Sequence, residues 1–97
     1  MAKATPVRKT DGMEKPTQTV DARKLFSQNV KALRKAKKLA QEQLADLAEL
    51  HVNYISGIER GARNVSILNI EKLARALGVT MSVLVDESDA RPGAQQR

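Results

Sequence analysis

The side chains that could carry out chemistry are few in this sequence, and they do not form a catalytic set. The 97 residues include one histidine and no cysteine. We find no nucleophile elbow, no phosphate-binding loop and no metal-ligand spacing. The sequence therefore predicts a protein that is not an enzyme and that uses no metal and no cofactor.

The charged side chains instead favour a polyanionic partner. The chain carries a formal net charge of +6. Residues 21–40 carry +6, whereas residues 41–60 carry −3, so the positive charge is concentrated in one segment. Such a basic stretch is typical of proteins that bind nucleic acid. On charge alone, a basic helix that is merely solvated is an equally good interpretation.

Three other binding roles fit the sequence less well. A membrane-surface helix usually carries larger apolar anchors than Leu25 and Phe26. Recognition of RNA or single strands relies on stacking aromatic side chains, and the chain has one Phe, one Tyr and no Trp. A pure protein-interaction module, such as an antitoxin, is harder to exclude, although the tails contain no obvious toxin-binding segment.

The hydrophobic pattern indicates five helical stretches and no convincing strand. Apolar residues recur at helical spacing within residues 22–38, 41–48, 52–60, 67–77 and 81–85. Short connections between short helices predict an all-α fold, a compact five-helix bundle. This domain spans residues 21–86, between a flexible basic tail at 1–20 and a flexible tail at 87–97. No apolar run suits a membrane span or a secretory signal, so we expect a cytoplasmic, nucleoid-associated protein.

Residues 41–60 have the pattern of two helices that cross at a steep angle. The close crossing requires a small side chain on the first helix, and Ala45 supplies it. Only residues 49–51 separate the two helices. The apolar side chains expected to lock the second helix are Leu44, Leu50, Ile55 and Ile58.

Residues 22–85 resemble the XRE-like helix-turn-helix regulators, the family of the lambdoid phage repressors and Cro. The resemblance is carried by RKAKKLAQEQLADLAEL at 34–50, YISGIERGARN at 54–64 and IEKLARALGV at 70–79. The segment ELHVNYISGIERGARNVSILNI is especially similar to controller proteins of restriction–modification systems, with a prophage-type repressor as the alternative. The resemblance implies a transcriptional regulator that binds double-stranded DNA, with residues 52–60 as its recognition helix.

The resemblance also implies which side chains face DNA, and their chemistry agrees. Asn53 presents an amide that suits adenine, and Val52 can pack on a thymine methyl group. The residues expected to contact bases are Val52, Asn53, Ser56 and Arg63. Those expected to contact phosphates are Gln41, Tyr54, Arg60 and Asn64. Two alternatives stay open, since Asn53 could be a solvated amide and Tyr54 a packing aromatic.

The family further implies an ion pair between Arg34 and Glu59. A carboxylate beside the phosphates would repel DNA unless a partner neutralised it, so we expect this pair to fix the recognition helix. Three positions depart from the family. Ala40 cannot cap the supporting helix, which costs about 1 kcal/mol. Glu49 replaces the usual glycine and would adopt a left-handed conformation at about 1–2 kcal/mol, and His51 replaces Ser or Thr.

A homodimer is expected because one recognition helix covers too few base pairs to single out an operator. Two copies about a two-fold axis would read a near-palindromic site whose half-sites lie about 34 Å apart. The family commonly dimerises through its last helix, and RNA polymerase is a further candidate partner. The candidate interface residues are Leu68, Met81, Val83 and Leu84. Part of the apolar surface must pack inward, and we expect this first of Leu84 and Val85.

Overall fold

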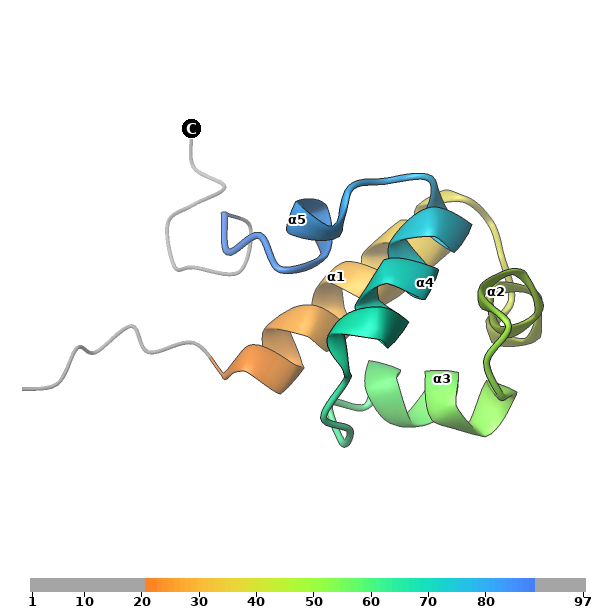
Figure 1. Cartoon of the computed structure of the whole chain (residues 1–97), viewed down its shortest axis with the longest axis horizontal. Coiled ribbons are helices and arrows are strands. Elements are labelled where there is room, and N and C mark those ends of the chain that lie inside the picture. The colour runs from red at the N-terminus through yellow and green to blue at the C-terminus, as the bar shows by residue number, and fades with distance from the viewer. Residues whose placement is uncertain (1–20, 89–97) are drawn as a thin grey trace, which may run out of the picture.

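The computed structural model describes residues 21–88, which form five α-helices with no strand among them (Figure 1). The all-α, five-helix prediction is therefore confirmed. The helices are α1 (Ala22–Ala36), α2 (Gln41–Ala48), α3 (Val52–Glu59), α4 (Ile67–Leu77) and α5 (Met81–Leu84). The expected tail at 1–20, and all but the first two residues of the tail at 87–97, lie outside the described residues.

The starts of α1 and α4 are fixed by side-chain caps. The Asp21 carboxylate accepts a hydrogen bond from the Arg23 backbone N–H at 3.0 Å. The Ser66 hydroxyl accepts one from the Asn69 N–H at 3.1 Å. Each cap satisfies a backbone donor that the first helical turn leaves without an intrahelical partner. Thr80, at the start of α5, makes no such bond.

The first four helices all end in the same way, with one residue in the left-handed conformation. Glycine takes this position after α3 and α4, whereas Lys38 and Glu49 take it after α1 and α2. After α2, for example, the Leu50 N–H donates to the Ala45 carbonyl at 2.9 Å, as in a Schellman motif. The left-handed Glu49 was predicted. The turn at Lys38 was not, and it ends α1 two residues before the predicted boundary.

The core lies where α1 packs on α3, α4 and α5, and where α2 packs on α3 and α4. Its contacts fix the direction of α3, because the inward face of that short helix is almost fully buried. The side chains with the least exposure are Val30, Leu44, Ile55, Ile58, Leu73, Leu77 and Leu84.

The last helix is held to the first by a polar contact that the hydrophobic pattern does not reveal. The Asn29 side-chain amide donates to the Leu84 carbonyl at 2.9 Å and to the Asp86 carbonyl at 3.1 Å. The Asp86 carboxylate in turn accepts hydrogen bonds from the hydroxyl and the backbone N–H of Ser88, which hold the pKa of Asp86 below its ordinary value. The two bonds from Asn29 join the end of α5 to α1.

The structure corrects the expected interface at Leu84. This side chain is 0% exposed because it packs into the core, so it cannot contact a second copy. Val85, which was also expected to pack inward, is 48% exposed. Leu68 and Val83 are exposed, whereas Met81 is half-buried against the core. Three of the four candidate interface residues, Leu68, Met81 and Val83, therefore keep surface that a second copy could contact.

No helix between residues 21 and 88 is long and apolar enough to cross a membrane.

Candidate nucleic-acid interface

The α2–α3 pair is joined by the short turn that the sequence predicted. Ala45 is buried where the two helices approach each other, and Glu49 turns the chain in its left-handed conformation. Leu44, Ile55 and Ile58 are fully buried, while Leu50 is partly buried against them. This packing presents α3 along one edge of the domain (Figure 1).

The outer face of α3 is polar. Asn53, Ser56 and Arg60 follow one another at helical spacing, on the side of α3 opposite its buried isoleucines. Gly57 shares this side but is buried, with the Arg63 side chain next to it. Asn53 and Arg60 are exposed and Ser56 is half-buried. The Ser56 hydroxyl accepts a hydrogen bond from Arg60 Nη1 at 2.8 Å. It can still donate its own proton to a ligand, because a hydroxyl is both donor and acceptor.

The start of α3 is capped by an imidazole in place of the usual hydroxyl. His51 Nδ1 accepts a hydrogen bond from the Asn53 backbone N–H at 3.0 Å. The departure at His51 therefore preserves the function of an N-cap, which is to satisfy a free backbone donor. Because the cap uses only the backbone N–H of Asn53, the Asn53 side chain takes no part in it.

The end of α3 is fixed by the predicted ion pair, which is present and has two hydrogen bonds. Arg34 Nε and Nη2 donate to the two Glu59 carboxylate oxygens at 2.7 and 3.0 Å. The Glu59 side chain is only 3% exposed. The Arg34 Nη1 atom also donates to the Leu39 carbonyl at 2.7 Å. One guanidinium thus joins α1, α3 and the loop that leads to α2.

Gln41 belongs to the same network, which the sequence did not reveal. Its Nε2 atom donates to Glu59 Oε1 at 3.0 Å. A side-chain amide carries two N–H groups, so one stays available to a ligand, and a phosphate contact of Gln41 stays a prediction. The α2 helix has no side-chain cap at Ala40, although the Ala40 N–H donates to Gln43 Oε1 at 2.7 Å. The first-turn N–H groups of α2 are therefore left without a side-chain acceptor, beside the Gln41 amide.

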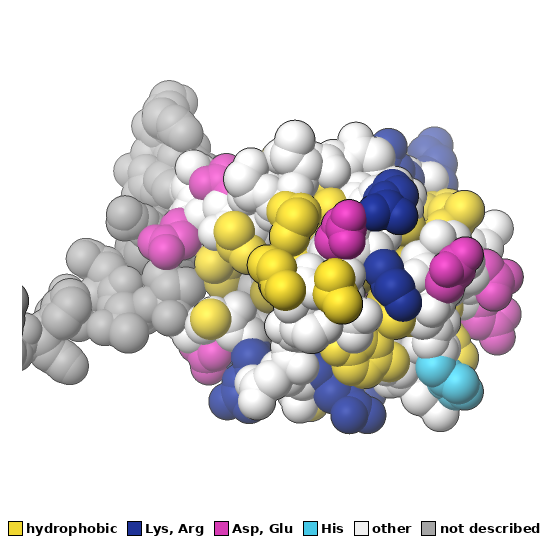
Figure 2. All heavy atoms as spheres, viewed as in Figure 1, with side chains coloured by type: hydrophobic (Ala, Val, Ile, Leu, Met, Phe, Trp, Pro, Cys, Tyr) yellow, Lys and Arg dark blue, Asp and Glu magenta, His cyan; other side chains and the backbone are white. Residues whose placement is uncertain are grey.

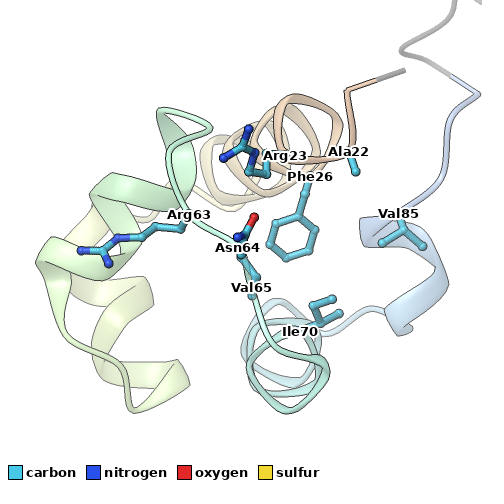
Figure 3. A pocket seen from close by; sticks show the side chains of 8 residues that line it. All are labelled: Ala22, Arg23, Phe26, Arg63, Asn64, Val65, Ile70 and Val85. Atoms are coloured by element: carbon cyan, nitrogen blue, oxygen red, sulfur yellow. The ribbon is translucent and has the colours of Figure 1, made fainter. Parts of the chain in front are cut away.

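Arg63 and Asn64 follow α3 in a connection that is anchored on the core. Val65 packs against the buried cluster. Arg63 contributes to the rim of a hollow of about 250 Å³ between this connection, α1 and α4. Figure 3 shows Phe26 and Ile70 lining that hollow, whereas the Arg63 side chain extends away from it, toward α3. The guanidinium carbon lies 5.5 Å from the centre of the Tyr54 ring.

Tyr54 has the packing role that was one of its two expected alternatives, together with a polar contact. Its ring is half-buried against the core. Its hydroxyl accepts a hydrogen bond from Asn69 Nδ2 at 3.1 Å. No residue spacing signals this contact, because it joins α3 to α4. The hydroxyl keeps its own proton, so a phosphate contact stays a prediction.

Charged side chains of both signs lie on the face seen in Figure 2. Lys and Arg side chains in Figure 2 include a group along the lower edge, where α3 lies in Figure 1, and others toward the upper right. Acidic side chains lie at the right-hand end, where α2 lies in Figure 1, and at several other places on this face. Among the described residues, no group of three His, Asp or Glu side chains is placed to hold a metal ion.

This geometry is that of a helix-turn-helix: two short helices cross at a small residue, and the outer face of the second is polar and exposed. The chain belongs to the helix-turn-helix family of XRE-like transcriptional regulators, whose family pattern matches residues 30–84.

Known proteins of restriction–modification systems are similar to this chain. It is 51% identical to the control protein C.BamHI of Bacillus amyloliquefaciens over 69 residues, which are 70% of this chain and 85% of that protein. The crystal structure of the controller protein C.AhdI from Aeromonas hydrophila matches with a TM-score of 0.63 and 48% identity, over 64% of this chain and 94% of that one. The controller protein C.Esp1396I, solved as a tetramer with its natural 35 base-pair operator, matches with a TM-score of 0.63 and 35% identity, over 68% and 87%. The expected similarity to controller proteins is confirmed.

Proposed function

We propose that this protein is a controller-type regulator that binds a near-palindromic operator as a homodimer, with α3 in the major groove. The observation that carries the proposal is the outer face of α3. It presents the exposed Asn53 and Arg60 at helical spacing, on a helix held at its start by His51 and at its end by Arg34 and Glu59. A helix anchored at both ends in this way can present its first residues to base edges.

The side chains divide into two groups by position and chemistry. Val52 and Asn53 lie at the start of α3, Ser56 lies one turn further along, and Arg63 lies alongside the helix, so we assign these four to base edges. Gln41 starts α2, Tyr54 lies on the flank of α3 that faces α4, and Arg60 and Asn64 follow α3; we assign these four to the phosphates. Such contacts place the protein on the duplex without reading its sequence.

The comparison with C.Esp1396I supports an oligomeric complex on an operator, since that relative was solved as a tetramer with operator DNA. For this chain we infer a homodimer as the basic unit, on the grounds that a single α3 reads few base pairs. Such a regulator acts on cytoplasmic DNA and needs no catalytic group. Contact with RNA polymerase stays a prediction.

The test is selection of binding sites from a random duplex library by the full chain, followed by titration of the selected site. We expect a near-palindrome with half-sites about one helical turn apart. With about 6–10 phosphate contacts per dimer, the affinity should fall by about 10³–10⁵ between 50 and 200 mM salt.

Two outcomes would contradict the proposal. One is equal affinity for the selected and scrambled duplexes at every salt concentration. The other is enrichment of single-stranded DNA or RNA over duplex when all three compete for the protein.

A further inference from the structure

The glycine inside the recognition helix has no backbone reason to be glycine. Gly57 lies in the middle of α3, and among the described glycines only Gly61 and Gly78 have a positive φ. Glycine inside a helix destabilises it relative to alanine. A side chain must therefore be disfavoured at this position by something outside the helix backbone.

The neighbour that a side chain would meet is Arg63. A Cβ atom on residue 57 would lie 2.9 Å from Arg63 Nε and 3.0 Å from Arg63 Cγ. Both distances are too short for an ordinary contact. The obstructed atoms belong to a flexible side chain, so a methyl group at 57 would displace Arg63 while the fold remained intact.

The end of the Arg63 side chain lies near an aromatic ring that is itself anchored. The guanidinium carbon lies 5.5 Å from the centre of the Tyr54 ring, a distance that allows a cation–π contact. The Tyr54 hydroxyl accepts a hydrogen bond from Asn69 at 3.1 Å. The Asn69 N–H in turn donates to the Ser66 hydroxyl, at the start of α4. The ring is thus tied to a second helix.

The guanidinium held in this way keeps its hydrogen-bonding capacity. Within residues 21–88, Arg63 makes no side-chain hydrogen bond and no ion pair. Arginine carries five N–H donors in a fixed planar array. Two of them suit the O6 and N7 acceptors of guanine in the major groove.

We propose that Gly57 is a positioning residue for base recognition. Gly57 and Tyr54 together form the surface on which the Arg63 side chain lies beside α3 before DNA binds. We call these two residues the seat of Arg63. Ordering the side chain in advance lowers the entropy lost on binding, and it directs the donors of Arg63 to one guanine in each half-site. The inference rests on the proposed function. Within it, Gly57 has the role of leaving room for Arg63 beside α3, in the position from which Arg63 contacts a base.

The seat can be tested on the free full-length protein by NMR. In the wild type, the Tyr54 ring current should shift the Arg63 side-chain protons upfield. Gly57→Ala should abolish that shift while the Tm stays equal or rises. Asn69→Ala, which releases the ring and leaves α3 unchanged, should reduce the shift. An unchanged Arg63 shift in a folded Gly57→Ala protein would overturn the proposal.

The consequence for recognition is tested with a double-mutant cycle on the selected operator. Gly57→Ala should weaken binding about tenfold and relax one guanine preference per half-site, as loss of one good base contact does. Arg63→Ala should have the same effect, and adding Gly57→Ala to it should change little. Equal weakening by Gly57→Ala with and without Arg63 would show that residue 57 acts on DNA directly, against the proposal. If the wild type selects no duplex, the proposed function fails, while the NMR result still decides whether the seat exists.

Discussion

The side chains on the outer face of α3 differ in what they can distinguish. The Asn53 amide both donates and accepts, as the adenine edge in the major groove requires, whereas Arg60 presents only donors. Arg60 is also held by the Ser56 hydroxyl, in the last turn of α3. An amide near the start of a recognition helix can reach bases, and a cation near its end can reach the backbone.

Replacing each of these two side chains by alanine should therefore give different binding profiles. Asn53→Ala should cost about 1–3 kcal/mol on the selected operator and relax the preference at one position in each half-site. Arg60→Ala should weaken binding to all duplexes alike and lower the slope of affinity against salt. The measurement is titration against a set of single-base operator variants at two salt concentrations. A profile left unchanged by Asn53→Ala would remove Asn53 from the base-reading set.

A buried carboxylate at the end of a helix that we propose to face DNA requires an explanation at the level of the helices. Glu59 is paired with Arg34 and hydrogen-bonded by Gln41, so its charge is neutralised before DNA approaches. These residues come from three different helices. The network fixes α3 relative to both α1 and α2, which is the angle on which base contacts depend.

Breaking this network from one side should be costly. Arg34→Ala leaves the Glu59 charge buried without its partner, and we expect a loss of about 3–5 kcal/mol in the free energy of unfolding. Arg34→Ala combined with Glu59→Ala should lose less than the sum of the single changes, by about 0.5–3 kcal/mol. Urea denaturation of the four proteins measures this coupling. Strictly additive losses would mean that the pair does not stabilise the fold.

Local signals were sufficient for most helix boundaries and insufficient for contacts between helices. The apolar spacing of α2 and the cap and stop of α4 lie within a few residues, so the sequence predicts those two helices to the residue. The left-handed Lys38 has no such signal, because lysine rarely adopts that conformation. Likewise the bond from Asn69 to Tyr54 joins α4 to α3 and could not be predicted from spacing. The Arg34–Glu59 pair was predictable only because the family resemblance implied it.

At the scale of the whole molecule, the two proposed surfaces lie apart. α3 lies along one edge of the domain and α5 along the opposite edge (Figure 1). Figure 2 shows hydrophobic side chains gathered between α5 and α4, and the exposed apolar residues of these helices and of the segment after α5 are Ile67, Leu68, Val83 and Val85. A second copy could cover this α4–α5 patch without blocking α3.

The homodimer prediction can be tested at this patch because its members do not contribute to the core. Leu68 is 65% and Val83 39% exposed, so a charged residue at either position should leave the protomer folded. In an interface, a buried unpaired carboxylate is strongly unfavourable, so Leu68→Glu and Val83→Glu should each shift the protein to the monomer in analytical ultracentrifugation at micromolar concentrations. Both should also bind operator one copy at a time and more weakly. Leu47→Glu is the matched control, because Leu47 is an apolar residue of α2 that is 58% exposed, and it should sediment like the wild type. A wild type that is monomeric at every concentration, with and without operator, would rule out the dimer. If Leu68→Glu and Val83→Glu both stay dimeric, the dimer interface lies outside the α4–α5 patch.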